Sequence, residues 1–152
     1  MSINTAPAAD SRALGLAHYA ARGVLERVLS GHDVTFLEQV TLRAAATDDA
    51  PPTPDDLVRR VEDSLKAEPA AVRAVIGTLL AKKLLSSDGS LLRPTGAGRD
   101  LLAVVATEVA PVSARIWGGI PAADLAAAGR VLAQVKERAE AELAQMDRPV
   151  SR

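Results

Sequence analysis

Residues 70–102, AAVRAVIGTLLAKKLLSSDGSLLRPTGAGRDLL, place a hairpin pattern between two helical patterns. Apolar residues recur at helical spacing over about 69–82 and predict a helix there. Two short apolar runs follow, at 84–85 and 91–92, and the Asp88-Gly89 pair between them is typical of a tight hairpin turn. Because two strands alone are barely stable, we expect this hairpin to pack against helices.

Helical patterns also dominate the rest of the chain. Thr53 and Thr95 are N-cap candidates, and Pro54 suits a first helical position. Pro111 removes a backbone donor and predicts a kink or a break near Ala110. Together with 69–82, the expected helices span about 11–30, 35–46, 54–66, 96–116 and 121–146.

The composition excludes several classes of protein. The chain is 48% hydrophobic but only 2% aromatic and has no cysteine, which excludes disulfides and thiolate metal sites. We therefore expect packed helices, no metal and no cofactor. No apolar run approaches the roughly 20 residues that span a bilayer, so we expect a cytoplasmic protein with no membrane partner. Two histidines and no phosphate-binding glycine loop argue against an enzyme.

The charge distribution is a weaker indicator. The net charge is −1, so the chain as a whole is not the basic protein that nucleic acid favours. Residues 53–99 carry eight Lys or Arg and six Asp or Glu, which makes this segment the net-positive third of the chain. Any contact with nucleic acid is therefore expected there.

Two helices joined by a short turn and followed at once by a hairpin form the pattern of a winged helix-turn-helix, in which the second helix enters the major groove. With the flanking helices, residues 12–146 resemble the MarR family of bacterial transcriptional regulators. The resemblance rests on the segments AAVRAVIGTLLAKKLL (70–85), RPTGAGRDLL (93–102) and IPAADLAAAGRVLAQV (120–135), and on the place of Pro111.

This resemblance implies an all-α fold with a small β-hairpin wing, in which a winged helix-turn-helix lobe is attached to a helical dimerisation body. We expect the lobe at 47–95, the dimerisation region at 11–46 and 96–146, a disordered arm at 1–10 and a flexible tail at 147–152. The family likeness also implies a homodimer on a pseudo-palindromic operator in double-stranded DNA, most simply a repressor. Release by a small anionic or aromatic ligand is implied as well.

The outward face of the 69–82 helix is the expected reading surface. Small side chains let a helix sit deep in the major groove, and Arg73 can contact guanine O6 and N7 or a phosphate. The alternative is an ordinary solvated face in an alanine-rich chain. The residues of this face are Ala70, Arg73, Ala74, Gly77 and Thr78.

Three hairpin residues, Ser87, Ser90 and Arg93, are expected to meet phosphates or the minor groove. The alternative is a turn whose residues serve only the hairpin geometry. At the start of the 54–66 helix, plain capping is favoured over phosphate binding, because the carboxylates of Asp55 and Asp56 repel phosphate.

The scarce aromatic residues and two neighbouring polar ones are the candidates for a ligand pocket. His18 and Arg22 are four residues apart on one helix face and could hold a carboxylate. The alternative is a set of core aromatics beside a surface pair. The candidate residues are His18, Tyr19, Arg22, Phe36 and Trp117.

A function of another class is also open. The hairpin loop SSDGS carries no arginine, and the outward face of the 69–82 helix carries one. These features also fit a winged-helix dimerisation or protein-interaction module with little or no DNA binding.

Overall fold

The computed structural model describes residues 6–47 and 50–150. The chain divides into two units, Met1–Val112 and Ser113–Arg152. Of the predicted disordered arm and flexible tail, residues 1–5 and 151–152 lie outside the described residues.

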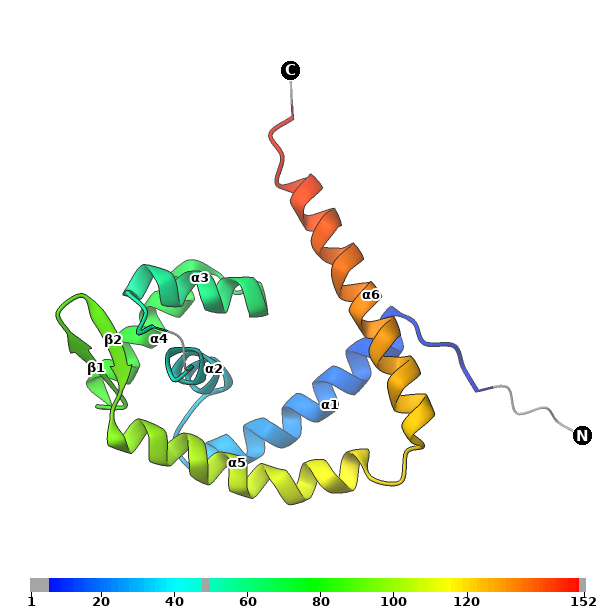
Figure 1. Cartoon of the computed structure of the whole chain (residues 1–152), viewed down its shortest axis with the longest axis horizontal. Helices are drawn as coiled ribbons and strands as arrows, with labels where there is room; N and C mark the ends of the chain where they lie inside the picture. Colours follow the sequence, from blue (N-terminus) through cyan, green and yellow to red (C-terminus); the bar gives the residue numbers. More distant parts are fainter. Residues whose placement is uncertain (1–5, 48–49, 151–152) are drawn as a thin grey trace, which may run out of the picture. The chain divides into compact units, whose positions relative to one another are not determined.

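The described residues form mostly helix with one two-stranded antiparallel hairpin, as the sequence predicts (Figure 1). Each helix begins and ends within one or two residues of its expected bounds. The second unit contains the last turns of α5 and all of α6 (Ala122–Met146). The first unit contains α1 (Ser11–Ser30), α2 (Phe36–Ala45), α3 (Pro54–Leu65), α4 (Pro69–Ala81), β1 (Leu85–Asp88), β2 (Leu91–Pro94) and most of α5 (Gly96–Trp117).

Local capping explains where the helices start. Thr53 accepts the backbone N–H of Asp56 at 3.2 Å, and the Asp56 carboxylate accepts the N–H of Thr53 at 3.3 Å. This is a capping box, and Thr35 and Glu38 form the same arrangement at the start of α2. These caps confirm the predicted role of Thr53.

One core joins α2, α3, α4 and the hairpin. Its buried side chains come from all of these elements and include Leu42, Leu57, Val61, Val72, Leu79, Leu85 and Leu92. Leu85 and Leu92 come from β1 and β2, so each strand places an apolar side chain among the helices. The backbone N–H of Leu92 also donates to the Pro52 carbonyl at 2.8 Å. The hairpin therefore depends on the helices for its stability, as expected.

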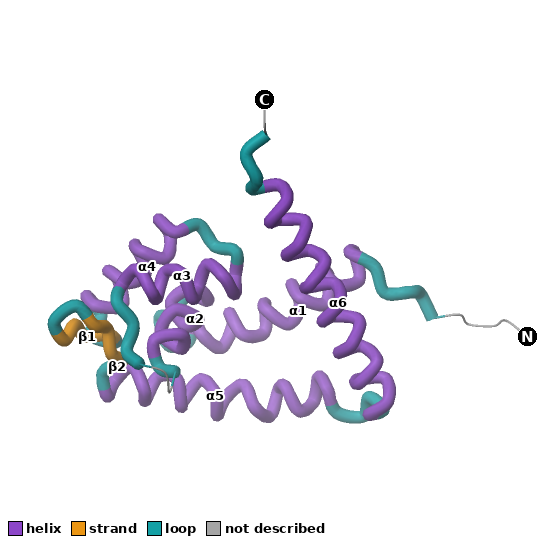
Figure 2. The backbone as a smooth tube through the Cα atoms, turned by 45° about the horizontal axis from the view of Figure 1, so that its top comes forward, coloured by secondary structure: helices purple, strands orange, loops and turns teal. Residues whose placement is uncertain are grey.

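The turn of the hairpin lies one residue later than predicted. Asp88 pairs with Leu91 in the ladder, so the two loop residues are Gly89 and Ser90. Among these two, Gly89 has the positive φ, +63°. A turn of the II′ type needs a positive φ at its first residue only, whereas an Asp-Gly turn of the I′ type would also force Asp88 to adopt one. Figure 2 shows the two strands in orange.

The junction between α4 and α5 is closely packed. Lys83 adopts φ +58° just after α4, and the N–H of Leu84 donates to the Leu79 carbonyl at 3.0 Å, as in a Schellman motif. Thr95 caps α5 by accepting the Gly98 N–H at 3.0 Å, and its hydroxyl donates to the Lys83 carbonyl at 2.7 Å. The start of α5 is thus fixed to the end of α4.

Pro111 lies inside α5, which continues through it to Trp117. Of the predicted kink or break near Ala110, the break is therefore wrong, because an α-helix can lose one backbone hydrogen bond at a proline without ending. In the second unit, α6 has no buried residue.

No single helix among residues 6–47 and 50–150 is long and apolar enough to span a membrane. By length and composition alone, α5 and α6 together could form a broken span.

Candidate nucleic-acid interface

The five residues predicted to read DNA lie on one exposed face of α4. Their spacing of three and four residues keeps them on the same side of the helix. The opposite side is anchored in the core by Val72, Ile76 and Leu79, all buried. The exposed residues are Ala70, Arg73, Ala74, Gly77 and Thr78.

Gly77 makes this face unusually accessible at its centre. A Cβ atom built at Gly77 would have no other atom within 4 Å, apart from the helix's own backbone, so packing within the chain does not require glycine there. Glycine in a helix interior costs about 1 kcal/mol relative to alanine. Gly77 thus weakens the helix and is not needed for packing. Such a glycine is consistent with a surface that another molecule approaches closely.

The two polar groups of this face already have partners in the single chain. The Arg73 Nη1 atom lies 2.8 Å from Oδ1 of Asp55 in the first turn of α3. The Thr78 hydroxyl donates to the Ala74 carbonyl at 3.1 Å. Both side chains are exposed, so each can exchange its partner for a group on a ligand.

The hairpin residues are exposed as well. Ser87 lies opposite Leu92 in the ladder, Ser90 is in the turn, and Arg93 is on β2. The Arg93 Nε atom lies 3.6 Å from Oδ2 of Asp88, so its nearest acidic neighbour is on the other strand. α4 and β1 are in contact, and both belong to the first unit.

Two lysines at the end of α4 differ in their surroundings. Lys82 donates to Oε2 of the buried Glu38 at 2.9 Å and to the Asp33 carbonyl at 2.7 Å, so it ties the end of α4 to the start of α2. Lys83 is exposed. Lys82 therefore has a structural role at the junction of α4 and α2.

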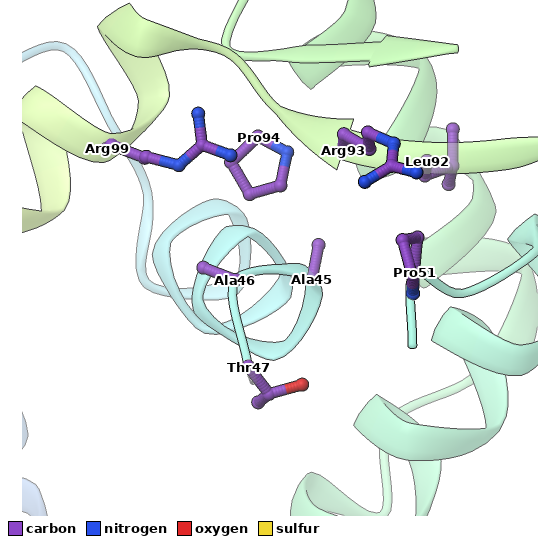
Figure 3. Close-up of a pocket in the computed structure, with 8 residues that line it drawn as sticks. All are labelled: Ala45, Ala46, Thr47, Pro51, Leu92, Arg93, Pro94 and Arg99. Atoms are coloured by element: carbon purple, nitrogen blue, oxygen red, sulfur yellow. The ribbon is translucent and has the colours of Figure 1, made fainter. Parts of the chain in front are cut away.

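A small cavity of about 170 Å³ lies at the end of α2 (Figure 3). Arg93 from β2 and Arg99 from the first turns of α5 extend over its rim, with Pro94 between them. Thr47, which also lines this cavity, accepts a hydrogen bond from Arg60 at 3.2 Å. Arg60 and Arg99 were not predicted site residues, because their positions beside α2 follow from helix packing and not from any sequence spacing.

A larger cavity, of about 400 Å³, brings together three of the five predicted ligand residues: His18, Arg22 and Phe36. The Arg22 guanidinium carbon lies 4.2 Å from the centre of the Phe36 ring, and its Nε atom is 3.0 Å from Oε1 of Glu26. The rest of the lining is Leu37, Ser64, Leu65 and Ala67.

The other two predicted ligand residues are placed elsewhere. Tyr19 is 70% exposed and does not line the cavity. Trp117 belongs to the second unit and is also exposed. No group of three or more His, Asp or Glu side chains within 6–47 and 50–150 is arranged to hold a metal ion.

Solved structures with the same fold were found for most of the chain. A SlyA-like transcription regulator from Listeria monocytogenes superposes with a TM-score of 0.73 at 17% identity, over 96% of this chain and 100% of that one. MarR from Staphylococcus aureus, solved with salicylate and kanamycin, superposes with a TM-score of 0.72 at 18% identity, over 84% of this chain and 87% of that one.

A third structure is that of BpsR from Bordetella bronchiseptica, whose DNA binding is regulated by 6-hydroxynicotinic acid. It gives a TM-score of 0.65 at 22% identity, over 86% of this chain and 99% of that one. The chain has the MarR-family fold. This confirms the resemblance and the fold class predicted from the sequence. No protein-family model matches the chain, and neither does any curated protein sequence.

In this winged helix-turn-helix fold, α4 is the second helix of the helix-turn-helix, and β1 and β2 are the wing. The core residues that place them, Leu79, Leu85 and Leu92, are all buried here. The exposed face of α4 and the hairpin are thus held by one buried core.

Proposed function

We propose that the protein is a transcriptional regulator that binds double-stranded DNA through α4 and the wing. The observation that carries this proposal is the exposed face of α4, where small residues surround a single arginine above a buried apolar side. Such a helix fits the major groove closely, and Arg73 can contact a guanine edge. Ser87, Ser90 and Arg93 would add contacts to phosphates.

The regulator would act as a homodimer on a pseudo-palindromic operator, most simply as a repressor. Support for a dimer comes from apolar side chains that are exposed in the single chain. On α6 these include Val131, Leu132, Val135 and Leu143, which are 41–46% exposed, and on α1 they include Leu14 and Leu16. Two lobes related by a two-fold axis would meet half-sites about 34 Å apart.

The cavity lined by His18, Arg22 and Phe36 is the proposed ligand site. It combines one aromatic ring with a guanidinium, a pair suited to a small aromatic or anionic ligand. Salicylate, which is bound in the S. aureus structure, is a suitable probe. We expect calorimetry to detect salicylate binding by the wild type and a loss of tenfold or more in Arg22→Ala, since a charged hydrogen bond contributes about 1.5–3 kcal/mol. Equal binding by both proteins would place the ligand elsewhere.

The decisive test of the main proposal is selection of genomic DNA fragments by the purified protein at low salt. We expect enrichment of a pseudo-palindrome by the wild type and its loss in Arg73→Ala. Arg43→Ala is the matched control, because Arg43 is an exposed arginine at the end of α2 and belongs neither to α4 nor to the hairpin. It should enrich the same sequence as the wild type.

One observation favours the alternative of a protein-interaction module. Both predicted DNA-contacting arginines lie beside carboxylates, Arg73 beside Asp55 and Arg93 beside Asp88. These neighbours reduce the positive potential that attracts DNA. No enrichment by the wild type at any salt concentration would support this alternative and reject the DNA-binding proposal.

A further inference from the structure

We propose that Asp55 is a specificity-determining residue, which holds Arg73 for base edges and keeps it from binding phosphates indiscriminately. This inference rests on the proposed function, since it concerns how α4 would read DNA. It assigns a role to a residue of α3 that lies 18 positions before Arg73 in the chain.

The geometry brings Asp55 directly to the reading surface. Its Oδ1 atom accepts a hydrogen bond from Arg73 Nη1 at 2.8 Å. α3 and α4 share the same buried core, through Val61 and Val72 among others, so the two side chains are held at neighbouring positions by packed helices. Asp55 also sits in the first turn of α3, where the helix dipole stabilises a carboxylate.

The capping box at the start of α3 does not include Asp55. Thr53 and Asp56 form the capping box, and Asp56 additionally pairs with Arg59. The Asp55 side chain is 68% exposed and has Arg73 as its partner within the described residues. Its contact with Arg73 is therefore the interaction that distinguishes it from an ordinary helix-start aspartate.

The pair leaves most of the guanidinium available. Arginine has five N–H donors in a rigid planar fork, and the bond to Asp55 uses one nitrogen, Nη1. The Nε and Nη2 edge can still approach the O6 and N7 atoms of a guanine side by side. A carboxylate bonded to Nη1 restricts the orientation of the guanidinium plane. Arg73 therefore loses less conformational entropy when it contacts a base.

The same carboxylate disfavours phosphates. A phosphate on the free Nε and Nη2 edge would bring a full negative charge beside the Asp55 carboxylate, whereas a guanine edge is neutral. Because both groups are exposed, we expect this repulsion to weaken a phosphate contact by at most about fivefold. A good bidentate contact with guanine discriminates by about fivefold to more than a hundredfold. Asp55 thus lowers the affinity of Arg73 for a phosphate and leaves its affinity for a guanine edge.

The test uses the intact protein and two duplexes. One is a duplex enriched from a random-sequence library by the wild type, and the other has the same bases in shuffled order. Fluorescence anisotropy gives the Kd of each for the wild type, Asp55→Asn, Arg73→Ala and the double variant. Glu62→Gln is the matched control, because it removes the same charge from α3 about 10 Å further along the helix.

We expect Asp55→Asn to bind the shuffled duplex about two- to fivefold more tightly and the enriched duplex with little change, so the ratio of the two affinities falls. The dependence of log K on log salt for the shuffled duplex should steepen by about one phosphate contact. In the Arg73→Ala background the same substitution should leave the ratio and the slope unchanged, and Glu62→Gln should leave the wild-type ratio intact.

An unchanged ratio in Asp55→Asn would overturn the inference, and so would an equal effect with and without Arg73, which would reveal a general charge effect. Both results require a wild type that binds DNA. If the wild type enriches no duplex from the library, the proposed function itself fails and this inference fails with it.

Discussion

At the level of single residues, Gly98 determines how closely α5 approaches the end of α4. A Cβ atom there would lie 2.3 Å from the Leu84 carbonyl oxygen and 3.3 Å from Leu42 Cδ1. Because the first neighbour is backbone, Gly98→Ala should lower the free energy of unfolding by about 1–3 kcal/mol, measured by urea denaturation. Gly96→Ala, which places a Cβ in open space two residues earlier, is the control and should unfold close to the wild type.

Asp56 makes the start of α3 sensitive to acid. Hydrogen bonds from the side chain and backbone of Thr53, with the Arg59 guanidinium nearby, hold the pKa of Asp56 below its ordinary value of 3.8. A lowered pKa in the folded state stabilises the fold above the unfolded pKa, and this contribution is lost as the pH falls through the folded value. Asp56→Asn should therefore be less stable than the wild type near neutral pH, with the difference shrinking below pH 3.8 in denaturation series. Asp63→Asn, the same change outside the capping box, should show no comparable loss near neutral pH.

At the level of secondary-structure elements, one side of α4 packs in the core, and the other is the side that we propose approaches DNA. Gly77→Ala should stabilise the protein by up to about 1 kcal/mol in thermal or urea unfolding, because alanine favours the helix and its Cβ meets no atom outside the helix's own backbone. If α4 lies in the major groove, the same substitution should weaken binding to the selected operator, since the added methyl group would face the DNA. Higher stability with unchanged DNA affinity would show that this part of α4 stays outside the groove.

The elements were predictable from the sequence because their ends are encoded locally. Thr53, Pro54 and Thr95 mark helix starts through side chains that act within three residues. The hairpin turn was displaced by one residue because the choice between turn types depends on the backbone conformation of Asp88 and Gly89, which the dipeptide alone does not decide. The pairing of Asp55 with Arg73 could not be predicted, since it depends on how two helices pack across 18 residues of chain.

At the level of the whole molecule, the described part of the chain leaves apolar surface without a partner in one copy. α6 has no buried residue. Three of its apolar residues, Val131, Leu132 and Val135, are each 44–46% exposed and lie within a turn and a half of the helix. Exposed aliphatic side chains grouped in this way are characteristic of protein–protein contacts. The same helix carries the charged residues Lys136 and Glu140, which pair with each other at 3.1 Å.

A second copy of the chain is the partner that we expect for this apolar side, and one substitution tests it. Leu132→Glu would bury a carboxylate in a dimer interface, so light scattering after size exclusion should show a shift from dimer to monomer at micromolar concentration. Gln134→Glu adds the same charge two residues away at an exposed polar position and should remain dimeric. If α6 forms the dimer, the Leu132→Glu monomer should also lose affinity for the full pseudo-palindrome, because one lobe can contact only one half-site. A Leu132→Glu protein that stays dimeric would place the dimer contacts on other surfaces, such as the exposed Leu14 and Leu16 of α1.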